Sequence, residues 1–318
     1  MIPSIRRSIF YVAATLLLHL MTGVLGAAEP AAGPTQIEQI GEEAGRAIAS
    51  YFAIDKTIPL EARVVEKRNR PGDVREKIVF RGAQGFLVPG YLQKPVSGEG
   101  PFPCVLLLHG WSGSKDAWWQ DGNIISGGNV RKALLEAGFA VFALDAQCHG
   151  DRISQNDFAP VNHYTEKDGG PNQRKGYFTL PEIYIQTTRD YRRAIDYLET
   201  RGDIDKSRIG MLGYSMGGHQ TFLLTGVEPR IKAAVACAAP STTDKFSPVA
   251  PQNFVRGFGD RPFLELMGRS DPLCPVGHAM ARFALIPGKN KSQVLFEADH
   301  KLPRDYVPHA VEWMKKHL

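Results

Sequence analysis

Apolar runs typical of buried strands alternate with helix-like segments from Pro103 to the end of the chain. The run CVLLLHG is continuously apolar and ends in glycine, which is typical of a strand covered on both faces, and VRKALLEAG follows it as a helix closed by Gly138. This order predicts an α/β fold with a doubly wound, mostly parallel sheet and helices on both faces. Further strands are expected at residues 139–146, 208–215, 231–240, 261–268 and 293–299, and further helices at residues 183–202, 216–226 and 305–318.

The composition is that of an ordinary globular protein, with 43% hydrophobic and 22% charged residues in a chain of 318. We find no second core, repeat or low-complexity linker in the sequence, so one domain of catalytic size is expected. The formal charge is +5 and the pI is 8.9, but no Lys/Arg run of the nucleic-acid-binding type stands out. We therefore expect no nucleic-acid partner.

The first 28 residues have the layout of a secretory signal peptide, with a basic start at Arg6 and Arg7, an apolar stretch and then small residues. We expect cleavage near Ala28 and export to the periplasm or the medium. The alternative is an uncleaved anchor, because residues 8–27 are about as long as a membrane-spanning helix. The small residues at the end argue against it, so we expect no membrane span after cleavage. The arginine pair leaves the twin-arginine route open beside the general one.

Two elements are expected before the alternating region. Residues 35–53 have apolar positions at helical spacing, which predicts an amphipathic helix. Residues 75–95 read as two strands joined through glycine, which is typical of an antiparallel pair at a sheet edge. The predicted organisation is therefore a signal peptide at 1–28, a helical extension at 29–75 and a catalytic domain at 76–318.

Ser215 lies in the sequence GYSMGG, directly after the predicted strand RIGML and at the start of the predicted helix MGGHQTFLL. A G-x-S-x-G match alone is weak, but the strand–turn–helix context is what a nucleophile elbow requires. Gly213 and Gly217 fit this interpretation, because the sharp turn leaves no room for side chains beside the serine. The pattern predicts Ser215 as a catalytic nucleophile.

A serine at its normal acidity needs a histidine base and an acid to orient that base, and in enzymes with this elbow both follow the serine in the order acid, histidine. Asp271 ends the apolar strand in PFLELMGRSDPLCP, at the sheet edge that faces the active site, so it is the predicted acid, with Asp299 and Asp244 as alternatives. His300 follows the last strand and is the predicted base. The histidines in or near helices are expected to be surface or packing residues: His278, His309 and His219.

The oxyanion formed by such a serine needs two N–H donors. The backbone N–H of Met216 lies beside Ser215 at the helix N-terminus, where the helix dipole adds positive potential. The strand before LLLHGWSGSK ends at His109 and Gly110, so the backbone N–H of Trp111 is the predicted second donor. His109 precedes the serine in the chain and is interpreted as a turn-stabilising side chain.

The motifs LLLHGWSGSK, LDAQCHGDR, GMLGYSMGG, MGRSDPLCP and EADHKLP together resemble the dienelactone hydrolase-like branch of the α/β-hydrolase superfamily, close to its serine esterases and acetyl xylan esterase relatives. The resemblance covers residues 76–318. It implies an eight-stranded hydrolase fold, the same triad and the same oxyanion donors. Dienelactone hydrolase itself uses a cysteine where this chain has Ser215, so its substrate is not implied. The helix at 35–53 lies outside the family pattern.

LDAQCHGDR corresponds to a stretch that braces loops in the wider family, so Asp145, His149 and Asp151 are interpreted as structural. The polar segment at residues 153–181 is long for a loop inside a compact domain, and it is expected to form one wall of the substrate cleft.

Trp118 and Trp119 follow the predicted oxyanion loop in SKDAWW. They are candidates for substrate binding in the same cleft. Packing in the core is an equally good interpretation, since large aromatic side chains dominate both environments.

Four cysteines in an exported chain would favour disulfides, but the family strand order argues against them. It separates Cys104 from Cys237 by one strand, about 10 Å at sheet spacing, which a disulfide cannot bridge. Cys148 and Cys274 follow strands about four positions apart, so four thiols are expected. No Cys/His spacing resembles a zinc site and no phosphate-binding glycine loop is found, so neither a metal nor a cofactor is expected.

These observations predict an exported serine esterase that cleaves a small-molecule or carbohydrate ester through an acyl-enzyme. One alternative is a peptidase of the prolyl oligopeptidase type, which shares the catalytic core. A second alternative is a binding protein that kept the fold without catalysis. The sequence leaves the ester and the oligomeric state open.

Overall fold

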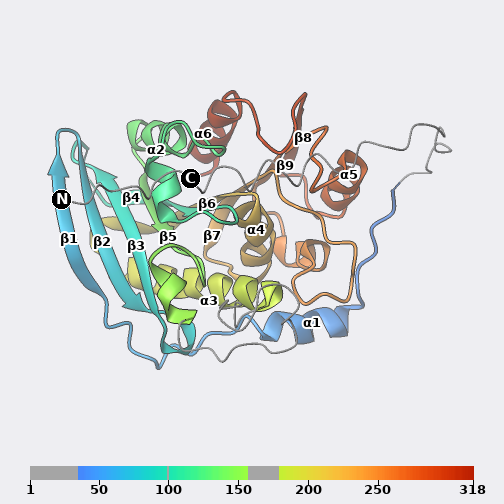
Figure 1. The fold of residues 1–318 in the computed structure, drawn as a ribbon, viewed down its shortest axis with the longest axis horizontal. Coiled ribbons are helices and arrows are strands. Elements are labelled where there is room, and N and C mark those ends of the chain that lie inside the picture. The colour runs from blue at the N-terminus through green and yellow to red at the C-terminus, as the bar shows by residue number, and fades with distance from the viewer. Residues whose placement is uncertain (1–34, 99, 157–178) are drawn as a thin grey trace, which may run out of the picture. The chain divides into compact units, whose positions relative to one another are not determined.

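The computed structural model describes residues 35–98, 100–156 and 179–318, and residues 36–318 form one compact unit. Within it, nine strands form one sheet in the order β1-β2-β3-β5-β4-β6-β7-β8-β9 (Figure 1). The strands are β1 (Arg63–Arg70), β2 (Asp73–Arg81), β3 (Leu87–Pro95), β4 (Phe102–Leu108), β5 (Ala140–Leu144), β6 (Ile204–Tyr214), β7 (Ile231–Cys237), β8 (Phe263–Gly268) and β9 (Lys291–Phe296). The helices are α1 (Glu42–Ser50), α2 (Gly127–Glu136), α3 (Leu180–Glu199), α4 (Met216–Val227), α5 (Val276–Ala284) and α6 (Tyr306–His317).

The sheet is parallel from β5 to β9 and antiparallel at the β1–β3 edge. Every residue of β5 and β8 is buried, as expected for strands covered on both faces. The α/β class and the mostly parallel sheet are therefore confirmed. The described sheet has nine strands instead of eight, because β1 pairs with β2 at the antiparallel edge.

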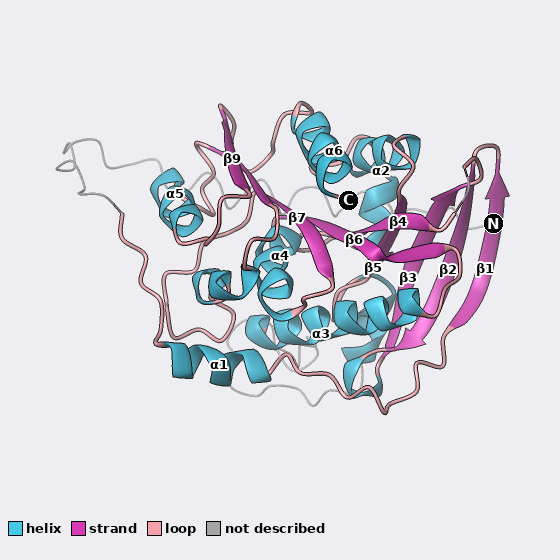
Figure 2. Ribbon diagram, turned by 180° about the vertical axis from the view of Figure 1, so that it is seen from behind, coloured by secondary structure: helices cyan, strands magenta, loops and turns pink. Residues whose placement is uncertain are grey.

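Helices cover both faces of the parallel strands (Figure 2). On one face, α2 and α6 bury residues such as Leu134 and Ala310 in one apolar cluster. On the other face, α3, α4 and α5 contribute residues such as Ile195, Phe222 and Ala279 to a second cluster. This arrangement is the doubly wound architecture that the alternating pattern predicts.

Helix α5 was not predicted from the sequence, where the strands expected at 261–268 and 293–299 follow one another with no helix between them. Only Ala279 and Arg282 are buried in its nine residues. At nine residues, α5 is shorter than the stretch of about 11–18 residues over which helical periodicity is read from a sequence. It nevertheless supplies the crossover that parallel pairing of β8 with β9 requires.

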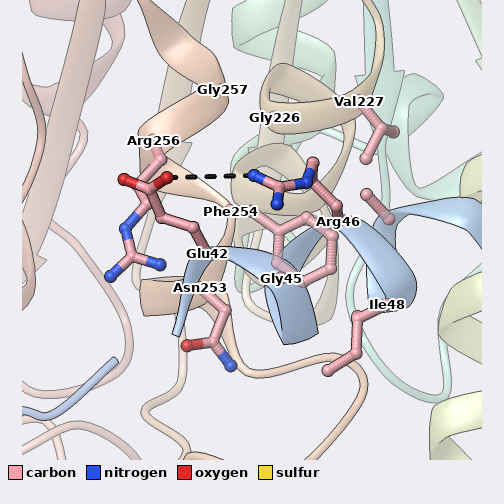
Figure 3. Close-up of a pocket in the computed structure, with 11 residues that line it drawn as sticks. Glu42, Gly45, Arg46, Ile48, Gly226, Val227, Asn253, Phe254, Arg256 and Gly257 are labelled. Carbon is pink, nitrogen blue, oxygen red and sulfur yellow. Dashed lines mark ion pairs between the residues drawn. The ribbon is translucent and has the colours of Figure 1, made fainter. Parts of the chain in front are cut away.

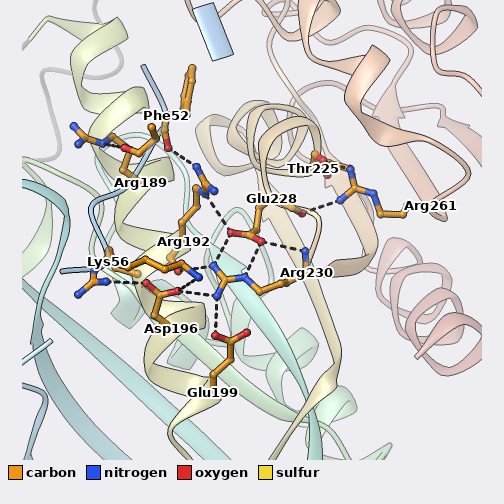
Figure 4. Close-up of polar contacts among 12 residues, drawn as sticks. Phe52, Lys56, Arg189, Arg192, Asp196, Glu199, Thr225, Glu228, Arg230 and Arg261 are labelled. Carbon is orange, nitrogen blue, oxygen red and sulfur yellow. Dashed lines mark hydrogen bonds and ion pairs between the residues drawn. The ribbon is translucent and has the colours of Figure 1, made fainter. Parts of the chain in front are cut away.

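Arginines of α3 bind the segment that precedes the sheet. Arg192 donates to the carbonyl of Phe52 (2.6 Å) and also bonds Glu228, and Arg189 donates to the carbonyl of Ala53 (2.9 Å) (Figure 4). Phe52 itself is completely buried. The extension therefore packs as part of the same unit.

The boundary predicted between residues 75 and 76 falls inside β2. The predicted helix at 35–53 is shorter in the structure, where α1 spans Glu42–Ser50. The predicted antiparallel pair at 75–95 is confirmed as β2 and β3, whose registers run from Asp73 opposite Pro95 to Arg81 opposite Leu87.

The strand order also bears on the cysteines. Cys104 on β4 and Cys237 on β7 are separated by β6, as expected, and both are buried free thiols, as is Cys274. Burial raises the pKa of all three thiols. Cys148 follows β5 and Cys274 follows β8, at positions four strands apart.

Two sequence predictions concern residues outside the described ranges. The signal peptide at 1–28 lies wholly outside them, and so does most of the segment at 153–181. Within the described ranges, no helix combines the length and apolarity needed to cross a bilayer.

Candidate active site

Ser215 occupies a sharp turn between β6 and α4. Its backbone has φ 57° and ψ −117°, a conformation that ordinary side-chain-bearing residues rarely adopt and that costs on the order of 1–3 kcal/mol. A Cβ on Gly213 would lie 2.1 Å from the carbonyl oxygen of Gly217, and one on Gly217 would lie 2.0 Å from that of Leu108. The glycines therefore have the steric role expected from the sequence: side chains at these positions would push apart the turn and the strand behind it.

Ser215, His300 and Asp271 form one hydrogen-bonded chain. Nε2 of His300 lies 2.8 Å from Oγ of Ser215, and Nδ1 lies 2.8 Å from Oδ2 of Asp271. The Asp271 side chain is completely buried, and its other oxygen accepts the N–H of Leu273 at 2.8 Å. Because a carboxylate can only accept, Nδ1 carries the proton and Nε2 presents a lone pair to the serine hydroxyl. The three side chains come from the ends of β6, β8 and β9, where parallel strands share one edge.

The loop after β4 lies against the serine. A Cβ on Gly110 would be 3.3 Å from Cβ of Ser215 and 3.8 Å from its Oγ. The next residue is Trp111, whose side chain is 55% exposed. Among the described residues, we find no acceptor for the N–H of Trp111 or of Met216.

His109 holds this loop in place. Its Nδ1 donates to the carbonyl of Gly110 at 2.8 Å, and its Nε2 accepts the N–H of Ala146 at 3.0 Å. Burial lowers the pKa of His109 to about 3, so the ring stays neutral, as these two partners require. His109 therefore connects the end of β4 to the end of β5 as a turn-stabilising residue.

Asp145 also stabilises the loop after β4. Its carboxylate accepts the N–H of Lys115 (2.8 Å), the ammonium of Lys115 (2.8 Å) and the N–H of Asp151 (2.9 Å). Burial opposes the charge on Lys115, but the carboxylates of Asp145 and Asp151 outweigh it and raise the pKa of the ammonium. The structural interpretation of Asp145 and Asp151 agrees with these contacts.

His149 lies beside these residues, with its ring 5.1 Å from that of Trp111 and 5.4 Å from that of His109. Its Nδ1 donates to the carbonyl of Gln147 at 2.8 Å, and burial lowers the pKa of the ring. The imidazole is thus a neutral support for the indole of Trp111.

The two tryptophans predicted as substrate contacts, Trp118 and Trp119, pack away from the serine. Trp118 is completely buried in the cluster under α2, so the packing interpretation replaces substrate binding for this residue. Trp119 is partly buried; its Nε1 donates to Gln93 at 2.7 Å and its ring lies edge-on to Tyr91 at 5.0 Å. It therefore packs on β3, and the sequence could not separate these two environments.

The alternative bases lie elsewhere. His219 is buried on α4, where its Nε2 lies 2.6 Å from the carbonyl oxygen of Val249 and burial lowers its pKa to about 4. His309 lies on α6 with its ring against that of Phe296. His278 lies on α5. None of these three rings is hydrogen-bonded to Ser215 in the described structure.

The alternative acids serve local turns. Asp299 accepts the N–H of Lys301 at 2.7 Å, and Asp244 accepts the N–H of Phe246 at 2.8 Å. Neither bonds His300, whose Nδ1 is taken by Asp271. The described residues contain no group of three or more His, Cys, Asp or Glu side chains arranged for a metal ion.

A pocket of about 310 Å³ lies between α1 and the end of α4 (Figure 3). Its walls include Phe254 and the ion pair of Glu42 with Arg46 (3.8 Å). It reaches α4 at Gly226, eleven residues from Ser215, which is roughly 16 Å along a helix at 1.5 Å per residue. This pocket is therefore separate from the serine.

A smaller pocket of about 230 Å³ adjoins the histidine loop, which is the segment of residues 297–305 between β9 and α6. Lys301 and Leu302, which directly follow His300, contribute to its wall together with Ser126 and Arg304. Ser215, Asp271 and His300 are not among the residues that line it.

The chain is similar to proteins whose names describe hydrolases. YtaP of Bacillus subtilis (strain 168), whose name describes a hydrolase, is 27% identical over 245 residues, covering 68% of this chain and 76% of that protein. An Escherichia coli (strain K12) protein with the name carboxymethylenebutenolidase is 25% identical over 253 residues, covering 74% of this chain and 84% of that protein.

Among solved structures, the acetyl xylan esterase from Paenibacillus sp. R4 superposes with a TM-score of 0.67 at 19% identity, over 89% of this chain and 97% of that one. At that identity the likeness shows the fold. The model of the alpha/beta hydrolase family matches residues 105–315, which confirms the resemblance seen in the motifs. The chain therefore belongs to the alpha/beta hydrolase family.

Proposed function

We propose that this protein is a serine hydrolase that cleaves carboxylic esters, with Ser215 as nucleophile, His300 as general base and Asp271 as the acid that orients the base. The observation that carries the proposal is the unbroken chain from Asp271 through His300 to Oγ of Ser215, with both hydrogen bonds at 2.8 Å. A serine hydroxyl held by a neutral imidazole, which is held in turn by a buried carboxylate, is the arrangement that makes serine nucleophilic.

The reaction runs in two halves. Nε2 of His300 takes the hydroxyl proton as Oγ of Ser215 attacks the ester carbonyl carbon, and the carbonyl oxygen becomes an oxyanion. Collapse of this intermediate breaks the carbon–oxygen bond, and the alcohol leaves with the proton from His300. Water then attacks the acyl-enzyme with the same base, which releases the carboxylic acid and restores Ser215.

The oxyanion would be held by the N–H groups of Trp111 and Met216. Support for these donors comes from the contact of Gly110 with Ser215 and from the position of Met216 at the first residue of α4, where the helix dipole favours negative charge. One such donor is worth on the order of 10²–10³ in kcat. The neutral His109 and the buried Asp145 fix the loop that carries Trp111.

An ester is the substrate class that the relatives favour. One bears the name carboxymethylenebutenolidase, which refers to a lactone and hence to a cyclic ester, and a neighbour of the same fold is an acetyl xylan esterase. The exposed indole of Trp111, the residue after the glycine that packs against Ser215, offers an apolar surface for a small-molecule or carbohydrate ester. No metal or cofactor has a part in this mechanism.

The test is a substrate panel with the wild type and Ser215→Ala. The panel contains p-nitrophenyl esters of rising chain length, an acetylated xylan oligomer and a proline-containing peptide. We expect ester turnover by the wild type and a loss of on the order of 10³-fold or more in Ser215→Ala, with the same circular dichroism spectrum. Turnover of the peptide above every ester would favour the peptidase alternative. Retained ester turnover by Ser215→Ala would refute the assignment of the nucleophile.

We also propose export, on the basis of the sequence of residues 1–28. Expression of the full chain in a bacterial host, followed by N-terminal sequencing of the extracellular and periplasmic protein, tests this. A start near residue 29 is expected. A protein that keeps its first residues and stays in the cytoplasm would contradict the proposal.

A further inference from the structure

Tyr214 connects the segment that carries Ser215 to the segment that carries His300. It is the last residue of β6, and Ser215 follows it directly. Its side chain is completely buried. Its hydroxyl donates to the carbonyl oxygen of His300 at 2.9 Å and accepts the N–H of Leu302 at 2.8 Å. The phenol oxygen of Tyr214 therefore contacts the main chain on both sides of Lys301.

We propose that Tyr214 is a positioning residue of the hydrolase, whose hydroxyl fixes the backbone of the histidine loop so that the His300 ring reaches Ser215 and Asp271 together. The inference rests on the proposed function. It adds a residue that the G-x-S-x-G motif leaves unspecified, since Tyr214 occupies the variable position before the serine.

The loop needs such an anchor because neither helix nor strand covers residues 297–305. The N–H of Lys301 bonds only within the loop, to Asp299. The carbonyl of His300 and the N–H of Leu302 instead face the interior, where each takes the Tyr214 hydroxyl as partner. Without this oxygen, both main-chain groups would lose their partner beside a buried Leu302 side chain. Leaving a buried polar group unpaired is costly enough to move a loop.

The same residue is covalently joined to the nucleophile. The peptide bond from Tyr214 leads directly into the strained backbone of Ser215. The distance between serine and histidine is therefore set by a short path, from Oγ through the Tyr214 side chain to the His300 carbonyl. Burial raises the pKa of the Tyr214 hydroxyl, so it stays protonated and can donate through the neutral and mildly alkaline range.

A second buried tyrosine provides a matched control. Tyr306 packs its ring 5.7 Å from that of Tyr214, is also completely buried, and donates its hydroxyl to a main-chain carbonyl, that of Ile125. Tyr306→Phe and Tyr214→Phe each remove one oxygen from the same apolar cluster. Only the second change releases the histidine loop.

The kinetic test compares both variants with the wild type on a p-nitrophenyl ester. We expect Tyr214→Phe to lower kcat at least about tenfold with KM within about twofold, because misplacement of a catalytic group by a fraction of an ångström acts on the chemical step. Tyr306→Phe should keep kcat within about twofold of the wild type. The melting temperature should fall by a similar amount in both variants. An unchanged kcat in Tyr214→Phe, or an equal loss of kcat in both variants, would overturn the proposal.

A second measurement does not need a substrate. Diethyl pyrocarbonate modifies neutral imidazoles, and peptide mass spectrometry gives the rate at His300 alone. We expect this rate to rise several-fold in Tyr214→Phe, because the ring is less firmly held by its two partners, and to stay at the wild-type level in Tyr306→Phe. Equal rates at His300 in all three proteins would refute the positioning role. A wild type that cleaves no ester would count against the proposed function, and the modification rates would still decide the role of Tyr214.

Discussion

Substitution of Gly217 by alanine should separate the geometry of the elbow from its chemistry, since it adds one methyl group and removes no catalytic atom. The new Cβ would lie 2.0 Å from the carbonyl oxygen of Leu108 and 2.9 Å from that of His109. Both obstacles are backbone atoms at the end of β4, so neither can rotate away. The first turn of α4 must therefore move away from β4.

The size of that movement follows from the contact distance. A carbon and a carbonyl oxygen approach to about 3.3 Å, so the contact at 2.0 Å must open by roughly 1.3 Å. Such a shift carries Ser215 and Met216 away from Trp111, which is fixed to β4. A misplacement of about 1 Å costs on the order of 10²-fold in rate. Overpacking costs about 1–3 kcal/mol of stability.

The assay measures kcat and KM on a p-nitrophenyl ester together with the melting temperature. Gly202→Ala is the control, because a Cβ there meets nothing within 4 Å. We expect a loss of kcat on the order of 10²-fold in Gly217→Ala and none in Gly202→Ala. If Gly217→Ala kept kcat within about threefold of the wild type, the close packing of elbow and oxyanion loop would not be a requirement of the reaction.

Three further predictions test other parts of the structure. Asp271→Asn should lower kcat by on the order of 10³–10⁴ with little change in KM, because the amide can stabilise the wrong imidazole tautomer; steady-state kinetics with an unchanged melting temperature check this, and a loss below about tenfold would contradict it. The pKa of His219 is about 4 in the folded state and about 6.5 in the unfolded state, so the unfolded protein binds the proton more readily. This residue should therefore lower the free energy of unfolding by about 1.4 kcal/mol for each unit by which the pH is lowered from about 6.5 to about 4. Urea titrations at several pH values should therefore give a flatter profile for His219→Gln, and an unchanged profile would show that this ring is not held neutral. Phe52→Ala should cost about 3–5 kcal/mol in urea unfolding, whereas Tyr51→Ala, at a 61% exposed side chain, should cost under about 0.5 kcal/mol; equal costs would mean that the extension does not pack on the body.

Ser215, Asp271 and His300 could be predicted as a group from the sequence because three regularities coincide. Ser215 follows a buried strand and precedes a helix, and Asp271 and His300 follow later strands in the expected order. The carboxyl ends of parallel strands meet at one edge, so residues after different strands come together in the fold. The structure brings these three side chains into hydrogen-bond contact.

Strand β1 was missed for a physical reason. Its sequence RVVEKRNR has five charged residues of eight, and nearly every position is exposed. A strand with no buried face shows no alternation of apolar and polar residues, so the pattern from which strands are inferred is absent. Its pairing with β2 is made by the backbone, which every sequence has in common.

The supports of the site were also beyond the sequence. Nothing in the sequence alone marks Tyr214 or Lys115 as a support of the site, yet both side chains are completely buried. Their partners are the main chain of His300 and Leu302 for the first, and Asp145 for the second. Such contacts join segments far apart in the chain, and one sequence alone carries no sign of the pairing.

The central claim is that Ser215 is an activated nucleophile, and covalent labelling tests it most directly. The wild-type protein is incubated with a fluorophosphonate, and the adduct is located by intact-mass and peptide mass spectrometry, with His300→Ala as a second sample. We expect a single adduct on Ser215 in the wild type and a labelling rate lower by on the order of 10³-fold in His300→Ala. An unlabelled wild type, or an adduct on any residue other than Ser215, would contradict the claim.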